Sequence, residues 1–231
     1  GFRRAGELTV ARTSDEIATL EALKKQGEAK GVPDLEIWGQ ERVRKEEPNL
    51  SPEIVAALYA PTSGVVNPYE ACMRMAYHAR LNGVEFSMET LVTGIQSEEE
   101  ALVVETSKGS LRTRFVINAA GVHADDVAAL AGVGDFTLRI RKGEEYLLDK
   151  RLMGIVKRTI FPCPSEFTKG ILVIPTVEGT IMVGPTSHFV SDKEDLTTTP
   201  MGFEEVFRAA RALVPAISER DCIAQFAGLR A

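Results

Sequence analysis

The chain has 231 residues, 44% of them hydrophobic and 26% charged, which is an ordinary composition for a globular protein of one large or two small domains. Its formal net charge of −6 gives no general attraction to nucleic acid or anionic membranes, so an anionic ligand would need local positive partners. We expect neither an integral membrane segment nor a signal peptide. Cys72, Cys163 and Cys222 are isolated, which argues against a disulfide framework and a metal site and fits a reducing compartment.

The first predicted elements are a strand over 7–11 and a helix that opens at Ser14, the predicted N-cap, and stops at Gly31 and Pro33. A short, charged helix is predicted over 39–47. Pro68 opens a further helix that ends near Leu81, with Gly83 just beyond it and a strand predicted at 84–86. The other predicted elements are strands at 56–59, 90–96, 101–106, 111–117, 136–140, 144–148, 171–175, 180–184 and 222–227, and helices at about 122–131 and 202–213.

The order of these elements predicts an α+β fold with two structural units. Strands and helices alternate over 66–132, as in an α/β unit with a parallel sheet element. Strands follow one another with few helices between them after residue 132, which is typical of a mixed or antiparallel sheet. We therefore expect one domain at 66–132 and a strand-rich domain formed by 1–65 and 133–231.

The stretch from Arg114 to Gly121 is the strongest candidate for a ligand contact. Residues 115–117 read as a short buried strand that runs into the turn Asn118-Ala119-Ala120-Gly121 and then a helix. Asn and Gly tolerate unusual backbone angles, and the alanines carry so little side chain that a ligand could touch the main chain. An ordinary strand-to-helix connection is the alternative interpretation.

Other candidate residues are scattered along the chain. Arg139 and Arg141 alternate with apolar residues, so on a strand they would share one face, either as an anion-binding pair or as a solvated surface. Arg230 follows a predicted strand and a glycine, where its guanidinium could hold a carboxylate or phosphate, although a surface arginine is the alternative. His123 opens a helix beside the small-residue turn, as a ligand contact or a capping residue. No dinucleotide fingerprint, phosphate-binding loop, zinc motif or serine elbow is present in the sequence.

Taken in order, several stretches resemble the FAD-dependent glycerol-3-phosphate dehydrogenase group of the D-amino-acid-oxidase-like superfamily, with L-2-hydroxyglutarate oxidase as a near relative. The stretches are Gly6–Leu8, Arg44–Leu50, Tyr59–Pro68, Gly83–Phe86, Val92–Ile95, Val116–Gly121, Arg141–Tyr146, Val183–Thr186 and Phe226–Arg230. One departure is Val122-His123, where many relatives carry Pro-Trp. The resemblance implies a partial FAD-binding domain of the glutathione-reductase type beside a mixed-sheet substrate domain.

The resemblance also implies roles for individual residues. Val92 would offer main-chain contacts to the adenine end of FAD, and Asn118, Ala119, Ala120 and Gly121 would pass close to the flavin nucleotide. Substrate binding would involve three residues: Arg230, Arg141 and Gly143. The catalytic base is not identified by the resemblance, and His123 is the only candidate. No metal ligand is implied.

The implied activity is oxidation of a small anionic alcohol, sn-glycerol 3-phosphate, by hydride transfer to FAD. Oxidation of L-2-hydroxyglutarate, another 2-hydroxy acid or an amine stays open, as does a non-catalytic binding module on the same scaffold. The glycine-rich βαβ unit that holds the FAD pyrophosphate in such enzymes is missing, and the chain begins Gly1-Phe2 and stops after an apolar run. We therefore expect a piece of a longer enzyme that is inactive alone and binds FAD weakly or not at all. We expect a cytoplasmic location, with peripheral contact at the inner membrane and the identity of the electron acceptor left open.

Overall fold

A computed structural model describes residues 1–165 and 168–231 of the chain. Residue contacts divide it into two compact units, each formed by more than one stretch of sequence. Unit 1 comprises Gly1–Met73, Gly143–Ser187 and Leu196–Gly228, and unit 2 comprises Arg74–Lys142, His188–Asp195 and Leu229–Ala231. The chain thus leaves and re-enters each unit. It passes from unit 1 to unit 2 at residues 73/74 and back at 142/143, whereas the predicted domain boundaries are at 65/66 and 132/133. The assignment of a flavin domain to 66–132 stays a prediction.

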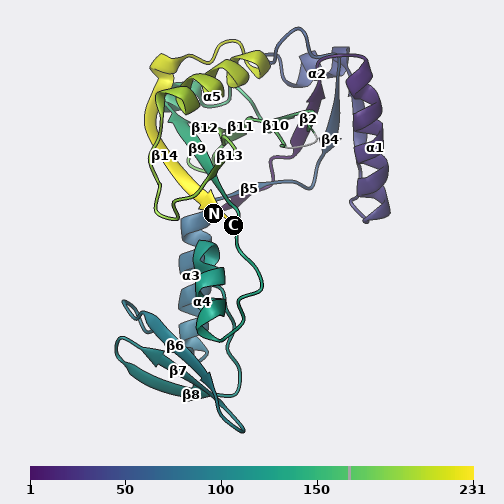
Figure 1. Cartoon of the computed structure of the whole chain (residues 1–231). Helices are drawn as coiled ribbons and strands as arrows, with labels where there is room; N and C mark the ends of the chain where they lie inside the picture. The colour runs from purple at the N-terminus through teal and green to yellow at the C-terminus, as the bar shows by residue number, and fades with distance from the viewer. Residues whose placement is uncertain (166–167) are drawn as a thin grey trace. The chain divides into compact units, whose positions relative to one another are not determined.

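The helices and strands are labelled in Figure 1. The helices are α1 (Asp15–Ala29), α2 (Gln40–Glu46), α3 (Pro68–Leu81), α4 (Ala124–Leu130) and α5 (Pro200–Leu213), with short 3-10 helices η1 (Gly121–His123), η2 (Lys150–Leu152) and η3 (Glu219–Asp221). The strands of the first half are β1 (Phe2–Arg3), β2 (Glu7–Ala11), β3 (Glu36–Gly39), β4 (Ala56–Ala60), β5 (Val65–Val66), β6 (Val92–Ser97), β7 (Leu102–Thr106) and β8 (Gly109–Thr113). Those of the second half are β9 (Ile140–Leu148), β10 (Thr159–Pro162), β11 (Leu172–Pro175), β12 (Ile181–Gly184), β13 (His188–Val190) and β14 (Cys222–Arg230).

Unit 1 is organised on a mixed sheet with the strand order β9-β12-β11-β10-β2-β4-β3. The pairing of β10 with β2 is parallel, with Ile160 opposite Leu8, and the neighbouring pairs are antiparallel. Strand β14 pairs with β9 outside this path. The predicted α+β class with a mixed and antiparallel sheet is therefore confirmed.

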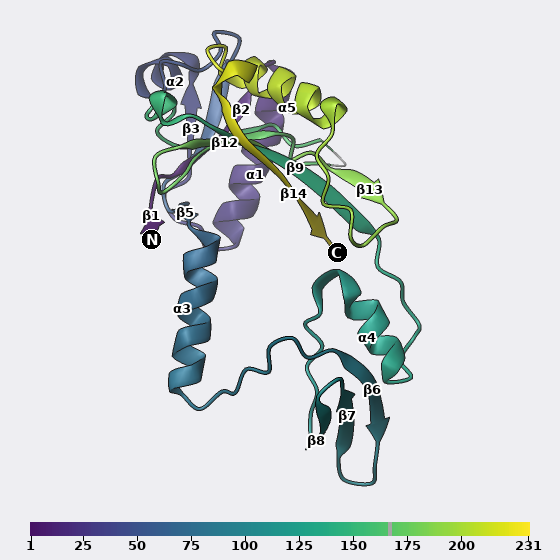
Figure 2. The same cartoon turned by 90° about the vertical axis from the view of Figure 1, so that its left-hand side faces the viewer.

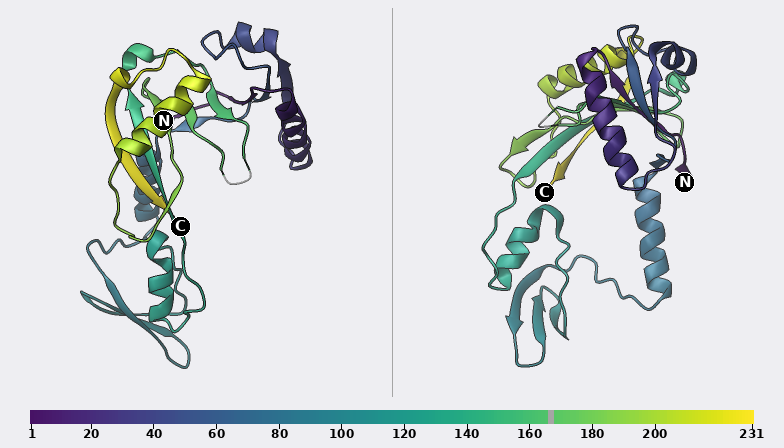
Figure 3. Two further views of the ribbon diagram at one scale, coloured as in Figure 1. Left: turned by 45° about the horizontal axis from the view of Figure 1, so that its top comes forward. Right: turned by 90° about the vertical axis from the view of Figure 1, so that its right-hand side faces the viewer.

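Alternation of side chains along the strands divides the core of unit 1 between the two faces of the sheet. Leu8 and Val10 of β2 belong to the larger cluster, which contains the buried residues of α5. Ala11 and its β4 neighbours Ala56 and Leu58 belong to a second cluster with Leu20 of α1. Helix α5 lies across β11 and β12, and α1 lies along β2 and β4 (Figures 1 and 3).

The start of α5 is held by a buried carboxylate on β9. Glu144, which is 2% exposed, accepts hydrogen bonds at Oε2 from the Thr199 backbone N–H (2.7 Å) and the Tyr146 hydroxyl (2.8 Å). Its Oε1 accepts from the Thr199 hydroxyl (2.9 Å), whose oxygen in turn caps the helix by accepting from the Gly202 N–H (3.0 Å). Burial and the adjacent carboxylate raise the pKa of Tyr146. The network joins sheet to helix without leaving a buried charge unsatisfied.

Unit 2 contains an antiparallel three-stranded sheet, β6-β7-β8, with α4 packed against β6 (Figure 2). A β-bulge interrupts the β6–β7 register between Val92 and Gly94. Elsewhere in this unit β13 pairs with the first three residues of β9, so that Phe189 lies opposite Arg141. The pairs β6–β7, β7–β8 and β13–β9 are antiparallel, and residues 84–86 form no strand, so the parallel sheet element predicted around 84–86 is not found there.

Two predicted strands in unit 2 are wrong. Residues 84–86 and 115–117 form no strand, and they are exposed rather than buried. The side chains of Phe115 and Ile117 are 78% and 90% exposed. Apolar residues favour a strand only where a neighbour supplies backbone hydrogen bonds and cover, and no strand of the described residues pairs with these segments.

Two further predictions are corrected. Residues 136–139 precede β9 instead of forming a strand, and β9 runs unbroken through residues 141–143, which separate the two strands predicted at 136–140 and 144–148. Ser14 does not cap α1 with its side chain. The Glu16 carboxylate, in the first turn, instead fixes the chain that leads into the helix, because its Oε2 accepts from the backbone N–H groups of Arg12 (2.6 Å) and Thr13 (3.3 Å).

Candidate functional site

The turn from Asn118 to Gly121 is held in shape by its own asparagine. The Asn118 side chain donates from Nδ2 to the Ala124 carbonyl (2.7 Å), and its Oδ1 accepts from the Ala120 N–H (3.2 Å). Gly121 has a φ of +58°, in the left-handed region that favours glycine. A Cβ added to Gly121 would meet no atom within 4 Å, so the space beside this backbone is open. The turn can therefore present main chain to a ligand.

A cluster of ion pairs follows the turn directly. His123 contacts Asp126 through Nδ1 (3.0 Å) and Glu194 through Nε2 (3.2 Å). Lys193 Nζ donates to Asp125 Oδ1 (2.5 Å) and to Asp126 Oδ2 (2.8 Å). These bonds connect the first turn of α4 to the segment after β13, about 70 residues further along the chain.

The charges in this cluster stabilise one another. The hydrogen bond from Lys193 lowers the pKa of Asp125 to about 2, and the Leu138 backbone N–H adds to the shift. Lys193 and His123 likewise lower the pKa of Asp126, and both aspartates raise the pKa of Lys193. Carboxylates contact both ring nitrogens of His123, and its role as a catalytic base stays a prediction.

Val92 is the first residue of β6 and is half-buried. Its strand packs against α4, the helix that follows the Asn118–Gly121 turn. Val92 and the Asn118–Gly121 turn, which the resemblance assigns to FAD, therefore lie on neighbouring elements of unit 2. Their contact with a cofactor stays a prediction.

Arg139 and Arg141 converge on one aromatic ring. Their guanidinium carbons lie 4.2 and 4.6 Å from the centre of the Phe189 ring, within cation–π range. Arg139 precedes β9, so the two arginines do not share a strand face as predicted. They instead contact the same aromatic ring, that of Phe189 on β13. Lys142, on the other face of the strand, is buried and pairs with Asp195 (2.7 Å).

The remaining predicted substrate residues lie on two paired strands. Arg230 is exposed at the end of β14, which pairs with β9, the strand of Arg141 and Gly143. Arg230 and Arg141 belong to unit 2, whereas Gly143 is buried in unit 1. The fold thus brings Arg141 and Arg230 into one unit, although they are 89 positions apart in sequence.

Sequence reasoning missed several residues that organise these sites. Lys193, Glu194 and Phe189 lie in a polar stretch without a motif, and Glu144 resembles any charged strand residue. Only the alternation of charge after β13 hinted at an ion-paired segment. Their partners are distant in sequence, so the contacts emerge only from the fold.

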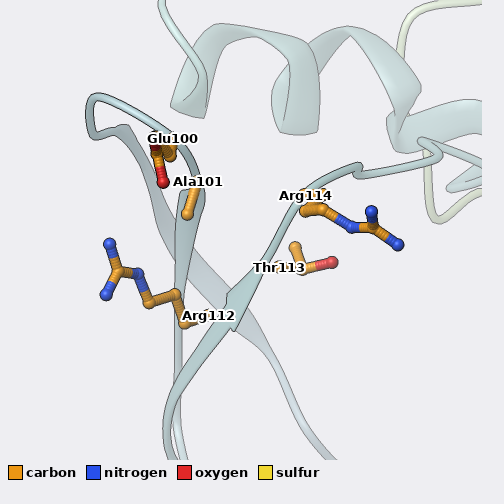
Figure 4. A pocket seen from close by; sticks show the side chains of 5 residues that line it. All are labelled: Glu100, Ala101, Arg112, Thr113 and Arg114. Carbon is orange, nitrogen blue, oxygen red and sulfur yellow. The ribbon is translucent and has the colours of Figure 1, made fainter.

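An open recess of about 490 Å³ borders the small sheet of unit 2 (Figure 4). It is lined by Glu100, Ala101, Arg112, Thr113 and Arg114. The side chains of Arg112 and Arg114 point in opposite directions, and Arg112 pairs with Glu98 (3.0 Å). The recess therefore does not form a converging anion site.

Two searches of the described residues gave no sites. None of the helices there has the length and apolar character needed to cross a membrane. Within the same residues, no three His, Cys, Asp or Glu side chains gather as metal ligands. All three cysteines are free.

Comparison with known proteins adds the family. The profile of a family described as "FAD dependent oxidoreductase" matches residues 1–231. The chain is 38% identical over 230 residues to a glycerol 3-phosphate dehydrogenase of Caloramator mitchellensis, covering 100% of this chain and 48% of that protein. It is 27% identical over 208 residues to the mitochondrial L-2-hydroxyglutarate dehydrogenase of Homo sapiens, covering 84% and 44%.

A solved structure gives the same result. The dithionite-reduced L-α-glycerophosphate oxidase of Mycoplasma pneumoniae, with FAD bound, matches with a TM-score of 0.93 and 29% identity, over 99% of this chain and 61% of that one. The chain spans about half the length of the dehydrogenase from Caloramator mitchellensis. The family predicted from the sequence is confirmed: the chain belongs to the FAD-dependent oxidoreductases.

Proposed function

We propose that these residues are part of an FAD-dependent dehydrogenase that oxidises sn-glycerol 3-phosphate to dihydroxyacetone phosphate. The observation that carries the proposal is the 38% identity to a glycerol 3-phosphate dehydrogenase along the whole chain. An alignment at this identity that covers the whole chain supports a shared substrate class more strongly than a shared fold does.

The residues of unit 2 suit a flavin nucleotide. The small side chains of the Asn118–Gly121 turn and the open space beside Gly121 leave room for a ligand against the main chain. These residues and Val92 would hold part of the FAD, which supplies the acceptor for a hydride from the substrate carbon. The protein would hold the substrate alcohol in position beside it.

The substrate carries a phosphate, for which arginine is the natural partner because its planar fork can donate two parallel hydrogen bonds. Arg230 is the proposed anchor, at the exposed end of β14. Arg141 on the neighbouring strand would add positive charge, and Gly143 would leave space along the strand. The base that removes the hydroxyl proton is unassigned, with His123 as the candidate.

We also propose that the main phosphate cradle of the FAD lies outside these 231 residues. The chain spans about half of its dehydrogenase relative, and unit 2 exposes apolar side chains that a further segment could cover. These residues are Met75, Tyr77, Leu81, Val84, Phe86, Met88, Leu91, Phe115, Val116 and Ile117. We further propose a cytoplasmic protein. If the electron acceptor is a quinone, the protein would contact the inner membrane peripherally; if the acceptor is oxygen or a partner protein, it would need no such contact.

The test is anaerobic reduction of the purified whole protein. The proposal expects a flavin spectrum that bleaches when glycerol 3-phosphate is added. Bleaching by L-2-hydroxyglutarate alone would instead favour the activity named for the human relative, and bleaching by an amine would favour an amine oxidase. Absence of flavin would favour a non-catalytic module on this scaffold.

A further inference from the structure

The segment Asp192–Asp195 carries three consecutive charged side chains that all reach other parts of unit 2. Lys193 donates to Asp125 and Asp126, Glu194 contacts His123, and Asp195 pairs with Lys142. Lys193 and Glu194 thus contact residues 123–126 at the start of α4, and Asp195 contacts β9. We call the segment Asp192–Asp195 the clamp, because it ties these two parts of unit 2 to the segment after β13.

Lys193 makes the strongest contact of the clamp with the start of α4, because the Lys193–Asp125 pair is less exposed than the Glu194–His123 pair. The Lys193 side chain is 22% exposed and that of Asp125 is 10% exposed, whereas the Glu194 side chain is 79% exposed. Partial burial reduces screening by water, so the Lys193–Asp125 pair is stronger than an exposed pair at the same distance.

Asp125 is the point at which three segments meet. Its Oδ1 accepts from Lys193 and from the Asp126 N–H (3.0 Å), and its Oδ2 accepts from the Leu138 N–H (3.1 Å) just before β9. One carboxylate therefore joins the start of α4, the approach to β9 and the segment after β13. Loss of Lys193 would leave this carboxylate with backbone donors alone.

The Asn118–Gly121 turn depends on the same anchor. Asn118 is bonded to the Ala124 carbonyl at the start of α4, and the His123 N–H donates to the Ala120 carbonyl (3.0 Å). The turn itself is largely exposed and has little packing of its own. Its place within unit 2 is therefore set by where the first turn of α4 is held.

We propose that Lys193 is a positioning residue for the flavin-facing turn: by fixing Asp125 and Asp126 it holds the Asn118–Gly121 backbone where it meets the cofactor. This inference rests on the proposed function, since it takes that turn to contact FAD. In this proposal Lys193 acts through its contacts with the first turn of α4. No signal in the sequence assigns it such a role.

The test compares Lys193→Met with Lys193→Arg and with a matched control, Lys24→Met. Lys24 pairs with Glu28 (3.6 Å) along α1 in unit 1. Lys24→Met therefore also removes a lysine–carboxylate ion pair, but one that lies outside unit 2. The first measurement is hydrogen exchange of residues 118–126 in the 231-residue chain. We expect faster exchange there in Lys193→Met, and wild-type rates in Lys193→Arg and Lys24→Met.

The second measurement is the dissociation constant for FAD in the whole protein. We expect it to rise about tenfold in Lys193→Met, with the KM for glycerol 3-phosphate unchanged, and to recover in Lys193→Arg. Unchanged exchange, or faster exchange with unchanged FAD affinity, would overturn the inference. A wild-type protein that binds no FAD would overturn the proposed function and this inference together, whereas the other negative results leave the proposed function intact.

Discussion

At the scale of single residues, Glu144 shows how unit 1 accommodates a charge in its interior. Its two carboxylate oxygens receive three hydrogen bonds, from Thr199 twice and from Tyr146 once. Glycine is required at position 202 because a Cβ there would collide with the Glu144 carboxylate. The residue therefore sets the start of α5, which in turn covers one face of the sheet.

Replacing Glu144 with alanine should lower the free energy of unfolding by about 3 kcal/mol, because the Thr199 and Tyr146 donors would lose their buried acceptor. Unfolding in urea measures the change. Glu204→Ala, an exposed glutamate on the same helix, is the control and should change stability by less than about 0.5 kcal/mol. Equal losses in the two variants would show that the buried network contributes nothing specific.

Arg230 is the proposed anchor for the substrate phosphate, so its replacement should change substrate affinity. Replacing it with lysine keeps the charge but removes the two-pronged hydrogen bonding, so the KM for glycerol 3-phosphate should rise by about tenfold or more. Steady-state kinetics of the whole protein checks this, with Arg208→Ala on α5 as the control. An unchanged KM in Arg230→Lys would remove Arg230 from the proposed substrate site.

At the scale of elements, the sequence predicted those that depend on local signals. Pro68 and Gly83 bracket α3 as expected, and a two-residue turn at 107–108 joins β7 to β8. The predictions at 84–86 and 115–117 failed because a strand needs a partner that local sequence does not reveal. The cluster around Lys193 could not be predicted, since its partners lie about 70 residues away. The turn at 118–121 was visible because small residues and Asn mark it locally.

The clamp on α4 should also give unit 2 a defined response to acid. The pKa of Asp125 is lowered to about 2 in the folded protein, so between its ordinary value of 3.8 and 2 the unfolded chain binds more protons than the folded one. The stability that Asp125 contributes is therefore full above pH 3.8 and is lost as the pH falls toward 2. Asp125→Asn should melt below the wild type at pH 6, and the difference should shrink at pH 2.5.

Thermal unfolding followed by circular dichroism at both pH values measures this difference. Asp15→Asn, an exposed aspartate at the start of α1, is the control. A gap between wild type and Asp125→Asn that stays constant from pH 6 to pH 2.5 would contradict the role given to Lys193, because the lowered pKa of Asp125 derives mainly from it.

At the scale of the whole molecule, the two units differ in how well they bury their apolar residues. Unit 1 has sheet faces covered by α5 and α1, with Tyr146, Phe207 and Leu8 fully buried. Unit 2 leaves Phe115 and Ile117 exposed, together with Met75, Tyr77 and Leu81 of α3. Large apolar residues at this exposure are typical of a surface that another segment covers.

The 231-residue chain alone should therefore bind FAD weakly or not at all. Titration of FAD fluorescence with the purified chain checks this, with the whole protein as the positive control. A yellow preparation carrying stoichiometric FAD would show that the turn at Asn118–Gly121 and its neighbours are sufficient for tight binding, and that the main phosphate cradle lies within these residues.

We propose that this fold serves the oxidation of glycerol 3-phosphate by a flavin. Adding glycerol 3-phosphate to the whole protein under anaerobic conditions and recording its visible spectrum tests this. We expect rapid bleaching of an oxidised flavin, and slower bleaching at low substrate concentration in Arg230→Lys. A protein that contains flavin but keeps its oxidised spectrum with glycerol 3-phosphate would contradict it.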